Sequence, residues 1–230
     1  MKKTQVVIIL GPPGSGKGTQ ANLLAEKFGF FHLETSKIIE AKLASAKRNS
    51  FVLVQGKKYY LIEELKKREK GELMSPPLII SWLKKRIQEL GREGEKIVLS
   101  GSPRTLPEGE ELSPFIRKIY SKKNIKVILL ELSDNQSVKR NVSRRVCKLL
   151  YHPILSTKET KNLTKCPFDG SKLLNRKDDN EKIIRLRLQR YRDRTFPLVA
   201  IFKKQGFDIS KINGDKPVVD VFNAICKSLK

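Results

Sequence analysis

An unbroken apolar segment runs directly into a glycine-rich loop near the start of the chain. Residues 6–10 read Val-Val-Ile-Ile-Leu, a pattern typical of a strand that is buried on both faces. Residues 11–20 follow as Gly-Pro-Pro-Gly-Ser-Gly-Lys-Gly-Thr-Gln, and apolar residues at helical spacing come next. In such a context, loop N–H groups converge on phosphate oxygens, the helix N-terminus adds its positive end and Lys17 adds a point charge. The sequence therefore predicts a strand, loop and helix unit that binds the phosphates of a nucleotide.

Similar apolar runs recur along the chain and alternate with helical patterns. Five strands are expected, at residues 6–10, 30–34, 96–100, 126–132 and 207–212. Strands that alternate with helices favour an α/β fold with a parallel sheet and right-handed crossovers. Ligands of such sheets bind beyond the carboxyl ends of the strands. The phosphate loop, Thr35, residues 101–104 and Asp134 all follow strands, so we expect one site to collect them.

The segments between these strands carry further local signals. In the first half we expect a helix from Thr35, a small hairpin of residues 51–55 and 58–62, and a helix from Pro76. In the second half we expect a helix from Asp134 to Arg145, an irregular insertion at 147–175, a basic helix at about 180–204 and a last helix.

The formal net charge is +24, from 48 Lys and Arg against 24 Asp and Glu. Such a charge suits a nucleic-acid binder or an enzyme that handles polyphosphates. Because the basic residues are scattered, without a tail or an Arg-rich run, we interpret most of the charge as a solvated surface. Nonspecific contact with RNA stays an alternative interpretation.

Several negative features predict the compartment. The chain has no run of about twenty apolar residues, so no membrane-spanning segment is expected. Its first residues lead directly into the first strand, which does not suit a signal peptide. Its three cysteines are widely spaced and do not form a disulfide framework. Together these features predict a cytoplasmic protein, which we expect to be a monomer.

Several motifs resemble those of the adenylate kinase family, in the same order and over nearly the whole chain. The Gly-Lys-Gly-Thr-Gln form of the phosphate loop, with Gly18 directly after Lys17, is characteristic of that family. Residues 101–105, Gly-Ser-Pro-Arg-Thr, are similar to its Gly-Phe-Pro-Arg-Thr motif. The remaining matches are to its lid arginines and to the loop beside the donor adenine: Arg140, Arg144, Arg145, residues 176–179, Arg187 and residues 216–217.

This resemblance implies a P-loop NTPase-type fold, in which a parallel five-stranded sheet is flanked by helices and carries two mobile parts. The core would comprise residues 1–34, 76–146 and 177–230, with a helical acceptor-binding insertion at 35–75 and a small lid at 147–176. The implied reaction is ATP + AMP = 2 ADP with Mg²⁺, by electrostatic stabilisation of in-line phosphoryl transfer.

The resemblance also implies roles for individual residues. Arginine suits phosphoryl transfer because its planar fork holds phosphate oxygens bidentately. Arg104 would hold the acceptor phosphate, and Arg140 would stack on the donor base. The catalytic set would be Lys17, Arg104, Arg144, Arg176 and Arg187. The ATP-binding set would be Gly14, Ser15, Gly16, Lys17, Gly18, Thr19, Arg140, Arg144 and Lys216. The acceptor-binding set would be Thr35, Lys37, Gly101, Arg104, Glu108, Arg176 and Arg187.

The acceptor half departs from the family pattern where an arginine usually grips the acceptor phosphate. This chain has Glu40 at that position. A carboxylate about 4 Å from a phosphate would cost several kcal/mol even at an effective dielectric constant near 20. Glu40 must therefore point away, or the phosphate must be held by another group. Lys37, one helical turn earlier on the same face, is the expected substitute, ahead of Lys42 and Lys47.

Three further departures bear on the acceptor and on magnesium. Glu108 stands where the family commonly has a glutamine that reads the adenine edge; a carboxylate only accepts hydrogen bonds, so it suits a base that offers N–H donors. Ser100 replaces an aspartate that helps to hold the magnesium waters, and Ser102 replaces a phenylalanine. A kinase for another nucleoside monophosphate is therefore an alternative.

The expected lid contains residues that suit a metal ion. Cys147, Cys166 and Asp169 fall where zinc-bearing lids of the family carry ligands, and Leu150 occupies the position of a further cysteine. His152 would complete the set Cys147, His152, Cys166 and Asp169, and zinc there would be structural. The alternative is two plain thiols beside a lid histidine.

An alternative of another class is a P-loop protein that uses nucleotide as a switch and binds RNA through its positive surface. Seven basic residues that could converge argue against it, because a switch has no need for so many convergent charges. They are Lys17, Arg104, Arg140, Arg144, Arg145, Arg176 and Arg187. The sequence therefore favours a nucleoside monophosphate kinase with ATP as donor and AMP as the first-choice acceptor.

Overall fold

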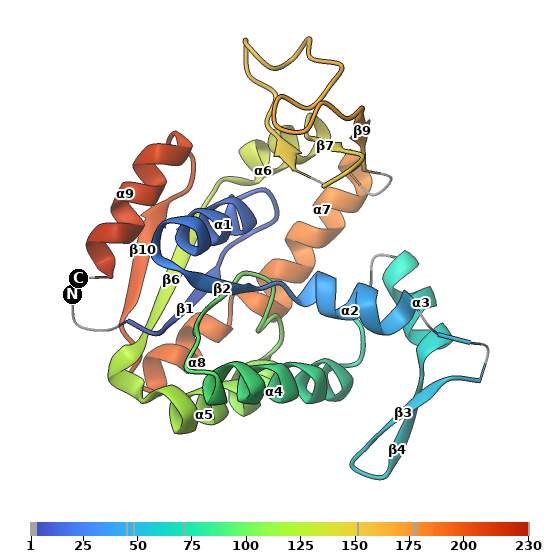
Figure 1. Cartoon of the computed structure of the whole chain (residues 1–230), viewed down its shortest axis with the longest axis vertical. Helices are drawn as coiled ribbons and strands as arrows, with labels where there is room; N and C mark the ends of the chain where they lie inside the picture. The colour runs from blue at the N-terminus through green and yellow to red at the C-terminus, as the bar shows by residue number, and fades with distance from the viewer. Residues whose placement is uncertain are drawn as a thin grey trace.

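A parallel sheet of five strands, in the order β10-β6-β1-β5-β2, forms the centre of the molecule (Figure 1). The computed structural model describes residues 4–44, 46–47, 49–70, 72–150, 152–176 and 179–229. The strands are β1 (Val6–Leu10), β2 (Phe30–Leu33), β5 (Lys96–Leu99), β6 (Ile125–Glu131) and β10 (Ile209–Asn213). Every residue of β1 is buried, as its apolar sequence predicts. The expected five-stranded sheet is therefore confirmed, with strand ends within two residues of the prediction.

The largest of these differences is at β10, which begins at Ile209 rather than at residue 207. Gly206, with φ of 72°, turns the chain after the preceding helix. The Phe207 ring then lies edge-on to that of Phe202, with centroids 5.5 Å apart, and its N–H donates to the Phe202 carbonyl. Phe207 thus belongs to the apolar core and not to the strand.

Helices cover both faces of the sheet, and the alternation of β1 explains which residues meet them. Val7 and Ile9 pack with α1 (Lys17–Phe28) and α9 (Val218–Ser228). Ile8 and its neighbours pack on the other face, against α4 (Pro76–Arg92), α5 (Leu106–Tyr120) and α8 (Leu198–Lys204). A short 3₁₀ turn, η1 (Lys122–Asn124), joins α5 to β6. In the part of the chain that the structure describes, no helix combines the length and apolar character that crossing a bilayer requires.

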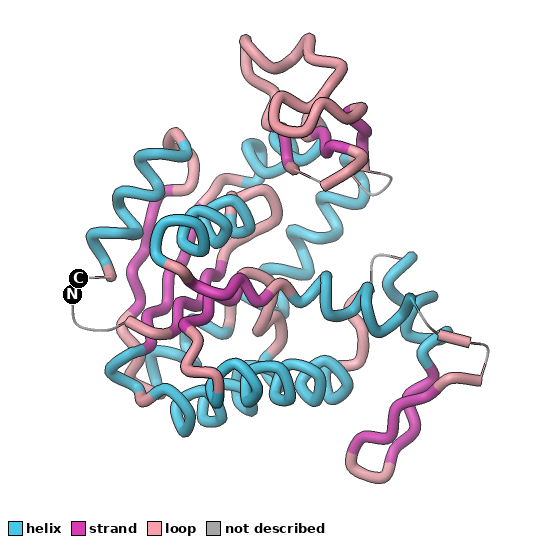
Figure 2. Tube along the Cα trace, in the orientation of Figure 1, coloured by secondary structure: helices cyan, strands magenta, loops and turns pink. Residues whose placement is uncertain are grey.

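An insertion between β2 and α4 extends away from the sheet and ends in a projecting hairpin (Figure 2). Its elements are α2 (Thr35–Ala44), β3 (Phe51–Val54), β4 (Lys57–Tyr60) and α3 (Leu61–Glu69). Gln55 and Gly56 form the two-residue turn, both with positive φ, which is the backbone that tight hairpins favour. The predicted hairpin is confirmed, although its second strand ends two residues early because the buried Leu61 starts α3.

The segment expected to form the lid, which we call the lid below, is preceded by a shorter helix than the sequence predicts. The helix predicted from Asp134 to Arg145 is wrong at its end, because α6 (Asp134–Val142) stops three residues earlier. The Ser143 hydroxyl donates to the Lys139 carbonyl and the Arg144 N–H donates to Asn141, which closes the last turn. Arg145 then pairs with residues 154 and 175 in a small antiparallel sheet. That sheet comprises β7 (Arg145–Cys147), β8 (Pro153–Ile154) and β9 (Leu173–Asn175), where an irregular segment was expected.

The prediction of a single basic helix at about 180–204 is also wrong, because the segment forms an α-helix, a π-helical turn and a second α-helix. α7 (Glu181–Arg190) passes into one π-helical turn, η2 (Tyr191–Thr195), in which the Phe196 N–H donates to the Tyr191 carbonyl at 2.8 Å. Pro197 has no N–H and so cannot continue the ladder, and α8 begins directly after it. Lys177 and Asp178, part of the expected 176–179 motif, lie outside the described residues.

Candidate active site

The phosphate loop lies between β1 and α1, at the carboxyl edge of the sheet. Two of its glycines are required by close packing. A Cβ on Gly11 would lie 2.6 Å from the Leu130 carbonyl oxygen, and one on Gly14 would lie 2.4 Å from the Asn141 amide nitrogen. Both residues also have positive φ. The loop is therefore held in one shape by its neighbours.

The α1 helix starts within this loop. Gly16 is its N-cap in a left-handed conformation, and Lys17, Gly18 and Thr19 form its first turn. The Ser15 side chain is buried, and its hydroxyl has no hydrogen-bond partner within the described residues. Gly214 approaches the loop from the other side of the site, since a Cβ there would lie 3.3 Å from the Ser15 carbonyl oxygen. The predicted ATP-binding loop residues thus share one edge of the sheet.

Lys17 is half-buried and lies among other cations. Its Nζ donates to the carbonyl oxygens of Gly11 and Pro12, each at 2.8 Å. Burial lowers the pKa of Lys17 to about 7, and the charges of Arg104 and Arg144 contribute to this shift. An anion in the loop would favour the charged form of Lys17 and so would raise its pKa again, as expected of a phosphate-binding site.

Two of the predicted arginines are oriented by one carboxylate. Asp179, whose side chain is 2% exposed, accepts from Arg144 Nε at 3.0 Å and from Arg144 Nη2 at 2.7 Å. Arg187 Nη1 lies 3.9 Å from the same carboxylate. Arg176, at the end of the lid, accepts the Asp179 N–H on its carbonyl oxygen. Asp179 was not among the predicted site residues, although it lies within the 176–179 match and directly before a predicted helix.

Not every basic residue of the lid is directed toward the site. Arg145 donates through its two Nη groups to the backbone carbonyls of Leu163 and Thr160. These bonds fasten the loop between β8 and β9 to β7. Arg145 therefore has a structural role within the lid.

Arg104 and Glu108 are linked through the start of α5. Arg104 Nε donates to the Gly101 carbonyl, and its backbone N–H donates to Glu108 Oε2 at 2.8 Å. Thr105 is the N-cap of α5 and accepts from the Glu108 N–H, while its hydroxyl donates to Glu108 Oε1. This arrangement resembles a capping box, except that Glu108 accepts the N–H of Arg104, the residue before the N-cap, and burial raises the pKa of Glu108. The Thr-x-x-Glu spacing of residues 105–108 is the sequence pattern that indicates this role.

The acceptor side contains two further contacts that the sequence did not indicate. The Thr35 hydroxyl donates to the Ser102 hydroxyl at 3.1 Å, directly beside Gly101. His32 lies between Asn22 and Ser100, with its two ring nitrogens 2.6 Å from the Asn22 amide oxygen and from the Ser100 hydroxyl. Ser100, the residue at the expected magnesium position, is thus the buried end of a hydrogen-bonded chain that reaches the surface at Asn22.

The residues near Glu40 are arranged differently from the expectation. Lys37 Nζ lies 3.5 Å from Glu34, and the Lys37 side chain is 75% exposed. Glu40 Oε1 instead accepts a hydrogen bond from Arg68 Nη2 at 2.6 Å. Arg68 was not among the predicted site residues, and no local pattern links two residues that lie on different helices.

The donor end of the site contains the predicted Arg140. Its Nη1 donates to the Gly214 carbonyl at 2.7 Å, and its Nη2 lies 3.3 Å from Asp215 Oδ1. Lys216 follows in the same loop and is exposed. Arg140 therefore contacts the loop that carries Lys216.

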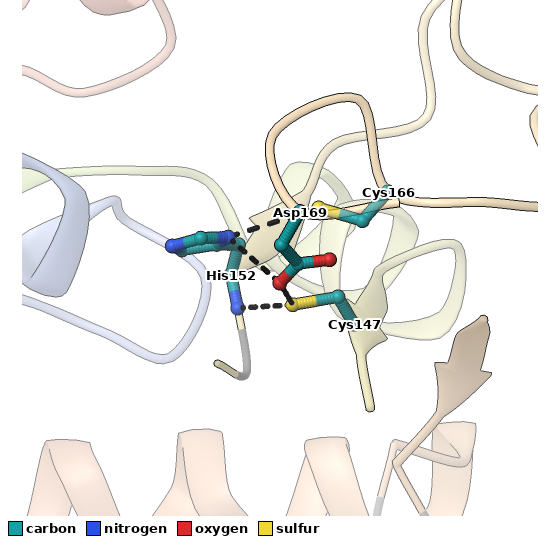
Figure 3. Close-up of side chains that lie close together, drawn as sticks. All are labelled: Cys147, His152, Cys166 and Asp169. Atoms are coloured by element: carbon teal, nitrogen blue, oxygen red, sulfur yellow. Dashed lines mark hydrogen bonds and ion pairs between the residues drawn. The ribbon is translucent and has the colours of Figure 1, made fainter. Parts of the chain in front are cut away.

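The four predicted metal ligands meet in the lid (Figure 3). The ligand atoms of Cys147, His152, Cys166 and Asp169 all lie within 4.8 Å of one another. His152 Nδ1 is 3.7 Å from Cys166 Sγ and 3.5 Å from Asp169 Oδ2, which in turn is 2.9 Å from Cys147 Sγ. Backbone N–H groups of His152 and Phe168 donate to the two sulfur atoms. Such N–H···S bonds suit thiolates that hold a metal ion.

Comparison with known proteins agrees with this geometry. A family model described as adenylate kinase matches residues 9–207. The chain is 34% identical over 225 residues to a protein named adenylate kinase from Methanothrix thermoacetophila, with 97% of each chain covered. Similarly named proteins from Clostridium botulinum and Archaeoglobus fulgidus are 31% identical over 226 residues and 32% identical over 222 residues, covering 97% and 95% of each chain. The chain therefore belongs to the adenylate kinase family and is a nucleoside monophosphate kinase of the α/β P-loop type.

Proposed function

We propose that this kinase transfers the γ-phosphoryl group of ATP to AMP and releases two molecules of ADP. The observation that carries this proposal is that Lys17, Arg104 and Arg144 lie near one another. Burial is the main cause of the lowered pKa of Lys17, and the charges of the two arginines lower it further. The three residues come from the phosphate loop, the loop after β5 and the hinge of the lid. Transfer between two nucleotides needs positive charge on both the donor and the acceptor side, whereas a nucleotide switch needs only the donor side.

The roles follow from position. Lys17 and the loop N–H groups would bind the outer phosphates of ATP, and Arg104 would bind the phosphate of AMP. Arg144 and Arg187, both held by Asp179, would stabilise the charge of the phosphoryl group in transit, and Arg176 would join them as the lid closes. The insertion at 35–75 and the lid at 147–176 would exclude water, so that the phosphoryl group reaches the acceptor rather than water.

Magnesium would enter with ATP. The described residues at this edge of the sheet offer hydroxyl groups, those of Thr19 and Ser100, which fit hydrogen bonds to metal-bound water better than direct ligation. Bound Mg²⁺ would neutralise part of the phosphate charge. Because His32 already contacts Ser100, the orientation of that hydroxyl depends on a neutral histidine, whose pKa is lowered chiefly by burial.

Zinc fits the four-residue cluster of the lid. Tetrahedral bonds of about 2.0–2.3 Å place neighbouring ligand atoms about 3.3–3.8 Å apart. The His152–Cys166 and His152–Asp169 distances of 3.7 and 3.5 Å fall in this range, whereas Asp169 and Cys147, now 2.9 Å apart, would separate slightly around a metal ion. The cluster also contacts a very small apolar group around Ile154 and Leu173, so a metal would supply the stability that this core lacks.

Metal analysis tests the zinc assignment. We expect about one zinc per chain in the purified protein and almost none in Cys166→Ser. Cys226→Ser is the matched control, because Cys226 lies in α9 and outside the cluster. A native protein that contains no zinc when purified without chelator would contradict the assignment. None of the three cysteines, all of which the structure describes, forms a disulfide, which agrees with the reducing cytoplasm that we propose.

An acceptor panel tests the proposed reaction. ATP or GTP would be supplied with AMP, GMP, CMP or UMP, and diphosphate formation would be followed for each pair. We expect ATP with AMP to give the highest kcat/KM. Lys17→Ala should lower kcat by several orders of magnitude, whereas Lys27→Ala, an exposed lysine of the same helix, should not. No turnover with any acceptor in folded protein would contradict the proposal.

A further inference from the structure

Glu40 and Arg68 form an ion pair between two helices of the insertion. Arg68 lies in the last turn of α3 and Glu40 in α2, and their closest nitrogen and oxygen atoms are 2.6 Å apart. The pair is solvent-accessible, with 37% of the Arg68 side chain and 59% of the Glu40 side chain exposed. Exposed pairs contribute little to stability, so this one is not needed for folding.

The position of Arg68 is set by a buried anchor at its neighbours. Glu64 is 3% exposed and accepts from Lys67 Nζ at 2.6 Å. It also accepts from the Ser75 N–H and the Ser75 hydroxyl, each at 2.7 Å. Glu64 lies in the first turn of α3 and Lys67 in its last turn, so these bonds join α3 to Ser75, the N-cap of α4. Arg68 directly follows Lys67, so its backbone is fixed while its guanidinium stays accessible.

Arg68 is connected to the acceptor side through its partner Glu40. Glu40 lies in α2, and the first residue of that helix, Thr35, contacts Ser102 and Gly101 in the loop that carries Arg104. Desolvation lowers the pKa of Arg104, and the neighbouring charges of Arg187 and Arg68 lower it further, while Glu108 raises it. Three guanidinium groups from separate elements are thus close enough to affect one another, and each has a carboxylate nearby: Glu108 for Arg104, Asp179 for Arg187 and Glu40 for Arg68. Lys37, the residue expected to replace the family's arginine, is directed to Glu34 and is largely exposed.

We propose that Arg68 is an acceptor-binding residue that contacts the phosphate of the acceptor nucleotide together with Arg104, and that Glu40 is a positioning residue that holds the Arg68 guanidinium. This inference rests on the proposed function, in that the acceptor is a nucleoside monophosphate. A guanidinium has five N–H donors, and Glu40 takes one of them at Nη2. The remaining donors suffice for a bidentate contact with phosphate. The carboxylate at position 40 therefore supports phosphate binding rather than opposing it.

Binding experiments separate a phosphate contact from a structural role. We would measure the affinities of the full chain for AMP and for adenosine, which lacks the phosphate, by titration calorimetry. Arg68→Ala should weaken AMP binding about 10- to 100-fold and leave adenosine binding within about twofold. Lys66→Ala, an exposed lysine on the same helix, is the matched control and should change neither affinity. Equal losses for AMP and adenosine, or an unchanged AMP affinity, would overturn the proposal.

Kinetics and rescue give independent readouts. Arg68→Ala should raise KM for AMP while KM for ATP stays within about twofold. Arg68→Lys should restore only part of the loss, because lysine cannot bind bidentately. Glu40→Arg combined with Arg68→Ala places an arginine on the facing helix and should recover most of the AMP affinity. Failure of this rescue together with a raised KM for ATP would assign Arg68 to the fold. Absence of turnover in the wild-type chain would refute the proposed reaction but leave the AMP and adenosine comparison intact.

Discussion

ATP binding should be coupled to uptake of a proton by Lys17. In the protein without nucleotide, burial and the neighbouring Arg104 and Arg144 charges lower the pKa of Lys17 to about 7. At pH 8 about nine-tenths of these side chains are then neutral. Phosphate favours the charged form, so the pKa rises on binding and close to one proton is taken up per ATP. Because the free form loses its proton as pH rises, the affinity for ATP should fall about tenfold between pH 8 and pH 9.

Titration calorimetry at pH 8 in two buffers with different ionisation enthalpies measures this uptake directly. The observed heats should differ by about 0.9 of the difference between the buffer enthalpies. Lys17→Arg is the control, since an arginine stays charged and should bind ATP without buffer dependence. Identical heats in both buffers would mean that Lys17 is already protonated in the free protein, and would refute the reasoning from burial and charge.

Two further substitutions test the supporting residues. Asp179→Asn removes the charge that orients Arg144 and Arg187, so kcat should fall about 10- to 100-fold with little change in KM for ATP; Asp193→Asn on the π-helical turn is the control, and equal rates for the two variants would contradict the role. Glu108→Gln keeps a side chain that fits the capping box and adds an N–H donor, so the ratio of kcat/KM for AMP to that for GMP should rise. Urea unfolding should show little change for that variant and a loss of about 1 kcal/mol for Glu108→Ala, while an unchanged ratio would separate Glu108 from base recognition.

The parts of the fold that the sequence predicts well are those with strong local signals. The first twenty residues contain the fully apolar β1, the glycine loop and the start of a helix, and each has a recognisable pattern. The same holds for β5 and for Arg104, which follows it in the sequence. The hairpin turn at residues 55–56 is a further example, because its positive φ values favour a glycine and Gly56 stands there between two apolar segments. These elements depend on neighbours in sequence, which is what a pattern records.

The parts that escaped prediction depend on contacts between distant residues. The lid strands are two or three residues long, too short for a periodic pattern, and their pairing joins residues 145 and 175. The pairs Arg68–Glu40 and Arg144–Asp179 span 28 and 35 residues. Pro197 is a helix-breaking residue visible in the sequence, yet the predicted basic helix ran across it. Only the fold brings these groups together.

Transfer of a labelled phosphoryl group tests the central assignment most directly. ATP labelled at the γ-phosphate would be mixed with unlabelled AMP and Mg²⁺, and the products would be separated. A kinase with this site should place the label in ADP formed from AMP and almost none in inorganic phosphate, and Lys17→Ala should form neither. Label that appears in inorganic phosphate at a rate independent of AMP would show that the site hydrolyses ATP and does not serve an acceptor.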